Sequence, residues 1–341
     1  MANLRVNKIV GIGSTDAGVI FNGDVKINTQ NVMYFPAGET KERGRGRGLI
    51  GGGSTPNTAD IEYLQIQSTG TSQDFGNLTS SRFGLAGCAS ATRGLFGGGA
   101  TPTKINTIEY VTIATTANAI DFGDLTTASR DKSSLSSATR GIWGGGDTGS
   151  VSDVIDFVTI ASAGNATDFG NLLSAETSFT ACSSPTRGLF AGGADPTAQN
   201  VIQYITIATA GNATDFGDLT AALLGMASAS SNTRGVFGGG NPGPTNAIEY
   251  VTIATTGNTT DFGDLTAARG QPGQGNLSNN IRGLFVGGYI PSPTSSDQNI
   301  IDYIIFASTG NAKDFGDINR AANDSNRELG LCSDSHGGLT E

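Results

Sequence analysis

The chain alternates short apolar segments with polar, glycine-rich turns, and no part of it shows the 3.6-residue spacing of an amphipathic helix. One representative stretch begins with small apolar residues at 83–90 and continues with a glycine-bounded segment at 94–98. β-Branched and aromatic residues dominate the next segment, 107–113, and a fourth begins at 121–125. Turn-forming residues separate these segments. The pattern predicts four short strands, named A to D in chain order, in about 45 residues, which is the size of a propeller blade.

Two phrases show that the four-strand unit is repeated six times. The first phrase, Arg-Gly followed by apolar residues and glycines, begins at Arg47, Arg93, Arg140, Arg187, Arg234 and Arg282. The second phrase, Asp-Phe-Gly, begins at Asp74, Asp121, Asp168, Asp215, Asp261 and Asp314. The sequence therefore predicts an all-β, six-bladed propeller over residues 47–341. A seventh blade stays open if residues 20–46 supply an incomplete one.

Closure of the ring is predicted from the two ends of the repeat region. The first copy, beginning at Arg47, has no strand A of its own, whereas residues 331–337 have the sequence of a strand A and its turn. We expect this C-terminal strand to complete the first blade, which removes exposed sheet edges. Cys88, Cys182 and Cys332 occupy one position of strand A, where small buried thiols are expected.

One order of residues recurs in the copies: a strand ending in a glycine pair, an acidic–aromatic pair, a second aromatic residue and an arginine. In the second copy these are Gly97-Gly98, Glu109-Tyr110, Phe122 and Arg130. In this order the chain resembles kelch-repeat propellers over residues 47–341, which implies a six-bladed, kelch-like fold. The chain departs from the kelch pattern in strand D, where phenylalanine replaces the usual tryptophan. Its single tryptophan, Trp143, falls in strand B and is expected in the core.

Charge and residue types argue against several classes of site. The chain carries a net charge of −10, so nucleic-acid binding is not expected. Its single histidine, His336, cannot build a histidine-based metal site, and a structural role is expected for it. No apolar stretch reaches membrane-spanning length, so membrane insertion is not expected. No cofactor, metal site or catalytic residue is predicted.

The repeated motifs are expected to serve the fold. Asp-Phe-Gly also occurs in protein kinases, but here it recurs at blade spacing without a kinase catalytic loop. We expect its aspartates to bond turn amides, its phenylalanines to pack between blades, and the repeated arginines to brace neighbouring blades. Two alternatives stay open. One is a structural calcium ion at paired carboxylates such as Asp121 with Asp124 or Asp215 with Asp218, and the other is a carboxylate–arginine cluster of a glycan-active enzyme.

Antiparallel strands place the A–B and C–D turns on one face of the propeller and the B–C and D–A loops on the other. The turns are nearly uniform between copies, whereas the loops differ in length and composition. The longest and most apolar B–C loop spans 289–299, and the D–A segment 270–276 also diverges. We predict that the variable face binds a ligand through Tyr289, Ile290, Asp297, Gln298, Asp195, Gln199, Asn241, Asn246 and Lys104. The alternative is sequence drift in unconstrained loops.

Residues 1–46 form a separate segment before the repeats. Leu4, Val6 and Ile9 alternate with polar residues, and Asn22-Gly23 marks a tight turn between apolar residues, so a short β-rich arm is expected. Exposed strands without partners in their own chain tend to pair with another protein. Together with the repeated Asp-Phe-Gly phrases, this segment resembles structural tail and fibre proteins of tailed phages with marine or cyanobacterial hosts.

The resemblance implies a non-enzymatic virion protein, located in a phage tail or appendage. In this hypothesis residues 1–46 attach to other phage structural proteins, and the chain forms a homo-oligomer in the virion. The propeller presents its variable face to a host-surface glycan or protein. Three alternatives stay open: a purely architectural tail or capsid component, a glycan-active enzyme, and a free glycan-binding lectin.

Overall fold

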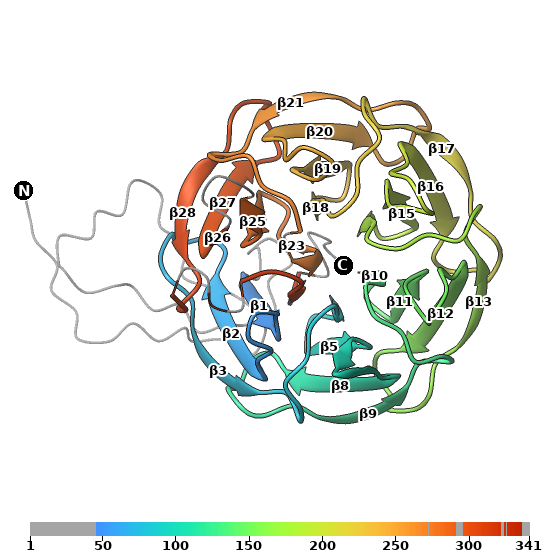
Figure 1. The fold of residues 1–341 in the computed structure, drawn as a ribbon, viewed down its shortest axis with the longest axis vertical. Coiled ribbons are helices and arrows are strands. Elements are labelled where there is room, and N and C mark those ends of the chain that lie inside the picture. The colour runs from blue at the N-terminus through green and yellow to red at the C-terminus, as the bar shows by residue number, and fades with distance from the viewer. Residues whose placement is uncertain (1–45, 272, 291–295, 322–323, 325, 336–341) are drawn as a thin grey trace, which may run out of the picture. The chain divides into compact units, whose positions relative to one another are not determined.

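The computed structural model describes residues 46–271, 273–290, 296–321, 324 and 326–335. Over these residues the protein is all-β, and six four-stranded antiparallel blades surround a central axis (Figure 1). The ring closes with six blades, as the repeat predicts, and the seven-bladed alternative is wrong. The predicted arm, residues 1–46, lies outside the described residues except for Gly46, and so does His336.

Each blade runs from strand A at the axis to strand D at the outer rim. Blade 1 contains β29 (Gly330–Ser333), β1 (Arg47–Gly51), β2 (Asp60–Gln65) and β3 (Gln73–Asn77). Blade 2 contains β4 (Ala86–Ala89), β5 (Arg93–Gly97), β8 (Thr107–Thr112) and β9 (Ile120–Asp124). Blade 3 contains β10 (Ser133–Ser136), β11 (Arg140–Gly144), β12 (Val154–Thr159) and β13 (Thr167–Asn171). Blade 4 contains β14 (Thr180–Ser183), β15 (Arg187–Ala191), β16 (Val201–Thr206) and β17 (Thr214–Asp218). Blade 5 contains β18 (Ala227–Ser230), β19 (Arg234–Gly238), β20 (Ala247–Thr252) and β21 (Thr260–Asp264). Blade 6 contains β23 (Leu277–Ser278), β24 (Arg282–Val286), β27 (Ile300–Ile305) and β28 (Lys313–Asp317).

Five further short strands lie in the loops. Two hairpins occupy B–C loops: β6 (Ala100–Thr101) with β7 (Thr103–Lys104) in blade 2, and β25 (Tyr289–Ile290) with β26 (Ser296–Asp297) in blade 6. The fifth, β22 (Gln274–Gly275), belongs to the linker between blades 5 and 6.

The last described strand closes the ring. β29 pairs antiparallel with β1, with Leu331 opposite Ile50 and Cys332 opposite Leu49. The backbone amide of Asp334 also donates to the carbonyl of Arg47 at 3.0 Å. The predicted closure by the C-terminal strand is confirmed, and it leaves β1 paired on both sides.

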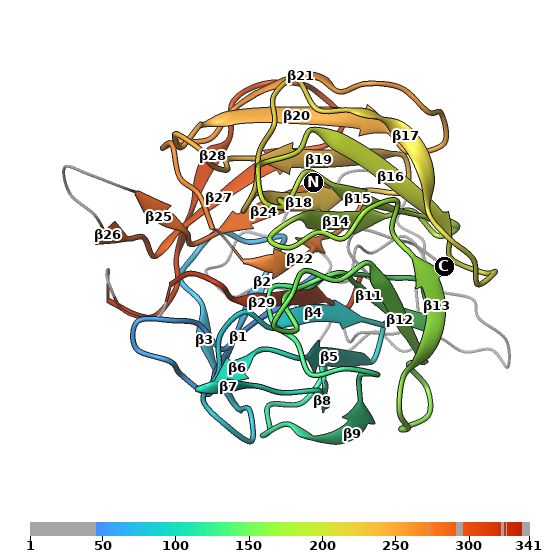
Figure 2. The same cartoon turned by 45° about the vertical axis from the view of Figure 1, so that its right-hand side comes forward.

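Serine hydroxyls join the inner strands around the axis. Ser134, Ser183, Ser230, Ser278 and Ser333 each donate to a backbone carbonyl of the preceding blade's strand A, at 2.7–2.9 Å. Blade 2 has Gly87 and Ala89 at these positions, and here β22 inserts between β4 and β29, parallel to both (Figure 2). The channel is thereby filled by the protein's own backbone. A remaining cavity of about 10 Å³, bordered by Asn276, has room for roughly one water molecule.

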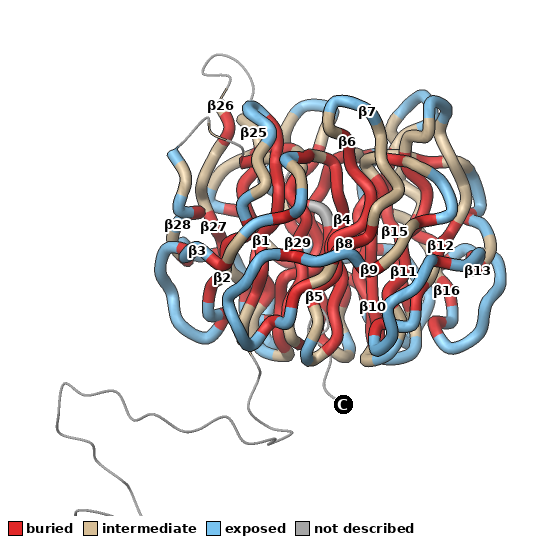
Figure 3. The backbone as a smooth tube through the Cα atoms, turned by 90° about the horizontal axis from the view of Figure 1, so that it is seen from below, coloured by how far each residue is buried: buried red, intermediate tan, exposed pale blue. Residues whose placement is uncertain are grey.

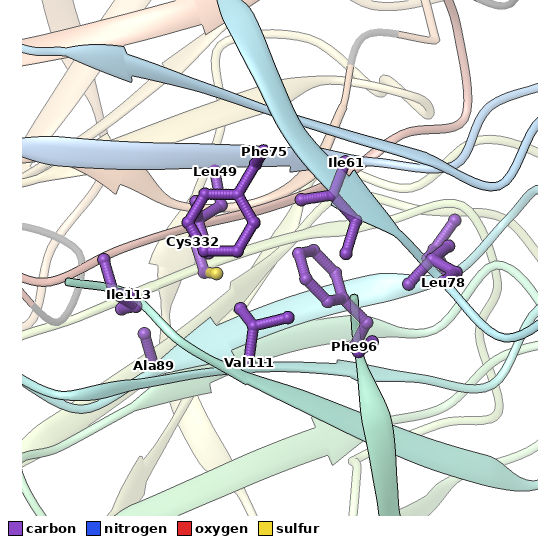
Figure 4. Packing of buried hydrophobic residues seen from close by; sticks show 11 residues of the cluster. Leu49, Ile61, Phe75, Leu78, Ala89, Phe96, Val111, Ile113 and Cys332 are labelled. Atoms are coloured by element: carbon purple, nitrogen blue, oxygen red, sulfur yellow. The ribbon is translucent and has the colours of Figure 1, made fainter. Parts of the chain in front are cut away.

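The hydrophobic core lies between blades. In the cluster shared by blades 1 and 2, Phe75 of β3 packs with Phe96 of β5 and Val111 of β8 (Figure 4). The phenylalanine of every Asp-Phe-Gly phrase is 2% exposed, and it meets the strand C aromatic of its own blade edge-on. The predicted packing of these phenylalanines is confirmed. Trp143 and the three thiols are also buried, as expected.

The repeated arginines tie each blade to the next. Each guanidinium donates from Nη1 to a backbone carbonyl of the following blade at 2.5–3.2 Å. Each also lies 4.3–4.9 Å over the strand C aromatic ring of its own blade. Arg282 bonds Ile66 of blade 1, so the bracing continues across the closure. The predicted bracing role is confirmed.

Glycine and asparagine join the blades at the outer rim. Gly123 has a φ of +146°, and a Cβ there would lie 2.5 Å from the backbone of Gly164 in the next blade's C–D turn. The amide of Gly164 donates to the carbonyl of Phe122 at 2.7 Å, and Asn165 Oδ1 accepts from the amide of Asp124 at 3.1 Å. The predicted aspartate bonds are mostly wrong. Among the described residues, the carboxylate of one Asp-Phe-Gly aspartate, Asp168, accepts such a bond, from the amide of Gly170.

Four blade junctions contain a buried ion pair. In each, an acidic residue of strand C meets a cation from the linker that leads into its blade. The pairs are Arg82–Glu109 at 3.4 Å, Lys132–Asp156 at 3.4 Å, Arg269–Asp302 at 2.9 Å and Arg320–Glu62 at 2.7 Å. Their side chains are at most 6% exposed. Removing one partner would leave a buried uncompensated charge, which is strongly destabilising.

The path of the chain distinguishes the two faces of the propeller. We call the face of the A–B and C–D turns the turn face, and the face of the B–C and D–A loops the loop face. The chain enters on the turn face at Gly46, whose carbonyl accepts from the amide of Ile66 at 2.5 Å. Strand A of blade 1 ends on the same face at Ser333. The hairpins β6–β7 and β25–β26 stand on the opposite, loop face (Figure 3).

The arginine brace predicts a measurable loss of stability. Arg187→Ala removes the bond to Ile253 and the stacking on Tyr204, and we expect it to lower the free energy of unfolding by about 2 kcal/mol. Arg187→Lys should recover only part, because an ammonium lacks the planar guanidinium that both stacks and bonds. Denaturant unfolding measures both, with Thr209→Ala on an exposed turn as the control. A loss in Arg187→Ala no larger than in the control would show that the brace does not stabilise the ring.

Candidate ligand-binding face

The loop face rests on a repeated backbone scaffold. Each D–A linker forms a short antiparallel bridge with the B–C loop of the blade into which it leads. The bridge pairs are Phe83–Ala100, Arg130–Asp147, Thr177–Ala194, Leu224–Asn241, Gly270–Tyr289 and Arg327–Ser54. Because the backbone makes these bridges, the six side-chain pairs are free to differ, and they range from apolar to ionic.

A ring of six equivalent residues surrounds the mouth of the central channel. Its members, which we call the mouth ring, have φ between 52° and 63°: Gly84, Asp131, Ser178, Gly225, Gln271 and Glu328. From Glu328 through Gly84 to Gln271, successive members are joined by backbone hydrogen bonds of 2.6–3.3 Å. After Gln271 the chain turns into the channel to form β22. Four of the six are not glycine, although this backbone region costs other residues energy.

Charged groups from three loops meet beside blade 3. Asp147 accepts from Lys104 Nζ at 2.6 Å and from Arg130 Nε at 3.2 Å. Arg130 also lies 3.5 Å from Asp131 and covers the ring of Phe83 at 5.5 Å. These side chains are partly exposed, from 17% for Asp131 to 36% for Arg130. They form a mixed-charge surface that is also aromatic at one edge.

A second charged group links blades 6 and 1. Arg327 lies 3.4 Å from Asp297 and covers the ring of Tyr289 at 5.3 Å. Its guanidinium also donates to Ser54 Oγ at 3.2 Å and Thr55 Oγ1 at 2.8 Å. Arg327 therefore fixes the β25–β26 hairpin relative to the B–C loop of blade 1.

Two carboxylates of the mouth ring flank Gly84. A Cβ on Gly84 would lie 2.7 Å from Oδ1 of Asp131, so the glycine leaves the space that this carboxylate occupies. Burial, followed by the negative charge of Glu328, raises the pKa of Asp131 to about 7, while Arg130 opposes the shift. Asp131 therefore titrates near neutral pH, where ordinary aspartates are fully ionised.

The predicted binding residues all lie on the loop face, but they do not form one cluster. Lys104, Tyr289 and Asp297 belong to the two charged groups, and Asp297 is buried at 4% exposure. Gln199 and Gln298 each bond within their own loop, to Thr197 and Ser296. The others are divided by exposure: Asn241 and Ile290 are half-buried, whereas Asp195 and Asn246 are exposed. Their role in binding stays a prediction.

The residues that organise the face were mostly missed from sequence. Arg130 was noted only as a kelch-like arginine, and Asp131, Arg327 and Glu328 were not singled out. The available signal was that the D–A linkers differ at equivalent positions. The divergent segment 270–276 does not add to the face as a loop would, because β22 within it fills the channel.

Neither a metal-binding cluster nor a membrane-spanning helix is found among the described residues, and two comparisons with known proteins found no match. No group of three or more His, Cys, Asp or Glu side chains is placed to hold a metal ion in this part of the chain. The same residues contain no helix, and hence none with the length and apolarity to cross a membrane. No protein-family model matches the chain, and no curated protein matches it in sequence.

The raised pKa of Asp131 predicts pH-dependent stability. The folded carboxyl keeps its proton up to about pH 7, whereas the unfolded carboxyl loses it near pH 3.8. The stabilising contribution is therefore complete below pH 3.8 and is lost as pH rises towards 7. Denaturant unfolding at several pH values should show a smaller fall in stability for Asp131→Asn than for the wild type. Identical pH profiles for the two proteins would contradict this account.

Proposed function

We propose that the protein is a non-enzymatic virion component of a tailed phage, in which a kelch-like propeller recognises a host-surface glycan or protein. In this proposal residues 1–46 attach the chain to other virion proteins and support a homo-oligomer. The kelch and phage assignments rest on the sequence phrases described above. The proposed division of labour rests on the two faces of the propeller.

The contrast between the faces carries the proposal. On the turn face, equivalent residues repeat from blade to blade and are used to join blades. On the loop face, one backbone scaffold presents six different side-chain pairs and a mouth ring of five residue types. A face that is regular in backbone and irregular in side chains is suited to recognising one asymmetric ligand.

The direction of the chain favours the loop face as the presented one. Residues 1–45 join the propeller at Gly46 on the turn face. We therefore propose the loop face as the presented one, because this junction with residues 1–45 lies at the opposite face of the propeller. The ion-paired and aromatic groups there suit a polar ligand such as a glycan, since partly exposed charged side chains bond hydroxyls without a large loss of hydration.

A glycan-active enzyme is the second candidate, because one observation favours it. Asp131 and Glu328 are two non-repeated carboxylates beside an arginine, and the pKa of Asp131 is raised to about 7. A carboxyl group with a pKa near 7 can supply the general acid of glycoside hydrolysis. Release of reducing sugar from host polysaccharide by the wild type, lost in Asp131→Asn, would favour this candidate.

Binding to whole cells tests the recognition proposal. Purified full-length protein should adsorb saturably to marine cyanobacterial cells and should compete with phage for infection. The double variant Lys104→Ala, Asp195→Ala alters two predicted residues of the loop face, and we expect it to weaken adsorption at least about tenfold. The double variant Thr116→Ala, Thr209→Ala on the turn face is the matched control and should bind as the wild type.

Two results would count against recognition by the loop face. Equal loss of adsorption in both double variants would show that the loop face contributes no more to adsorption than the turn face. No adsorption by a folded wild-type protein to any cell that supports infection would favour a purely architectural component.

A further inference from the structure

Two arginine–acid dipeptides occupy equivalent positions on the loop face. They are Arg327-Glu328, in the linker that leads into blade 1, and Arg130-Asp131, in the linker that leads into blade 3. In each, the arginine makes the bridge to a B–C loop and the acid belongs to the mouth ring. Phe83-Gly84 lies between them in the ring. The other three linkers have no charged residue at these positions: Thr177-Ser178, Leu224-Gly225 and Gly270-Gln271. The charge is therefore concentrated on one half of the channel mouth.

The backbone brings the two acids to either side of Gly84. The amide of Gly84 donates to the carbonyl of Glu328 at 3.0 Å, and its carbonyl accepts from the amide of Asp131 at 2.8 Å. Each such step spans about 5 Å of backbone, and the residue between the two acids has no side chain. A Cβ on Gly84 would lie 2.7 Å from Oδ1 of Asp131, so this carboxylate lies over Gly84. The charge of Glu328 acts on both Asp131 and Arg130.

Both acids occupy a backbone conformation that costs them energy. Their φ angles are +54° at Asp131 and +56° at Glu328, in the left-handed region that glycine adopts freely. Gly84 and Gly225 show that glycine is accepted at equivalent positions of the ring. Strained polar residues at such positions point to a role in binding.

Donors and acceptors in this half of the mouth are left available. Among the described residues, the carboxylate of Glu328 has no hydrogen-bond or ion-pair partner. Arg130 uses its Nε towards Asp131 and Asp147, and its two Nη groups bond no described residue. The side chains of Arg130 and Asp131 are 36% and 17% exposed, and Glu328 is half-buried. A ligand can therefore reach both carboxylate acceptors and guanidinium donors here.

The charges of this half nearly balance, which bears on the class of ligand. Three cations are opposed by four carboxylates: Lys104, Arg130 and Arg327 against Asp131, Asp147, Asp297 and Glu328. Such a surface favours neither a strongly anionic nor a strongly cationic ligand. A neutral ligand rich in hydroxyls fits it, because each hydroxyl can donate to a carboxylate and accept from a guanidinium.

We propose that a neutral hexose unit of a glycan binds over Gly84, between Asp131 and Glu328. Its hydroxyls donate to the two carboxylates and accept from the Nη groups of Arg130. The ring of Phe83, 5.5 Å from the guanidinium, helps to hold Arg130 in place. This inference rests on the proposed recognition function and deepens it, since it selects a glycan over a protein and names the position at which it binds.

Sugar titration of the full-length protein, followed by ligand-observed NMR, tests the site. The probes are D-glucose, D-galactose and D-mannose at pH 8, where Asp131, whose pKa is about 7, is mostly ionised. We expect the wild type to bind at least one of them saturably. Glu328→Gln and Asp131→Asn should each weaken that binding at least about tenfold, because an amide offers one acceptor oxygen and no charge. Asp121→Asn makes the same change at an exposed position of the outer rim, so it should bind as the wild type. Thermal unfolding checks that each variant is folded.

Cell adsorption separates the failure of this site from the failure of the recognition function. Wild-type protein that adsorbs to host cells but binds none of the three hexoses would keep recognition and overturn the hexose site. Hexose binding that is weakened in Glu328→Gln, by a protein that adsorbs to no host cell, would support the site and contradict host recognition. Hexose affinity that is the same in the wild type, Glu328→Gln and Asp131→Asn would also overturn the proposal.

Discussion

The burial of apolar side chains between neighbouring blades is the constraint on which this structure depends. A single blade exposes Phe75 and its equivalents, and only the next blade covers them. A ring of such units is stable when every blade has two neighbours, which makes the pairing of β29 with β1 essential. Without that pairing, β1 would be an open edge and the core shared by blades 6 and 1 would face water.

The same constraint explains why one face is uniform. Three features join adjacent blades: an arginine after each A–B turn that bonds the next blade, a glycine in each strand D that permits close approach, and an asparagine in five C–D turns that accepts from strand D of the preceding blade. A change at any of these positions weakens a junction. On the loop face, the backbone makes the equivalent contacts through the bridges and the mouth ring. The side chains there are therefore not needed for these contacts and can differ from copy to copy.

At two sites the copies differ in ionisable side chains. The mouth ring carries Asp131 and Glu328 beside Gly84, and one junction exchanges a cation–carboxylate pair for Glu176 and Gln203. Both sites contain a carboxylate whose pKa is raised to about 7 by burial. Both carboxylates lie in D–A linkers, at positions where the copies differ.

The sequence alone determined the repeat, and the repeat determined most of the fold. A period near 47 residues located four strands per blade, the blade number, the closing strand and the bracing arginines, because equivalent positions in a ring have equivalent neighbours. It also indicated that the B–C and D–A loops share one face. Only the tertiary structure decided that Arg327 covers the ring of Tyr289, that the charge of Glu328 acts on Asp131, and that β22 fills the channel. Those contacts join residues far apart in the chain at positions where the copies differ, so no period encodes them, and side-chain packing around the closed ring fixes them instead.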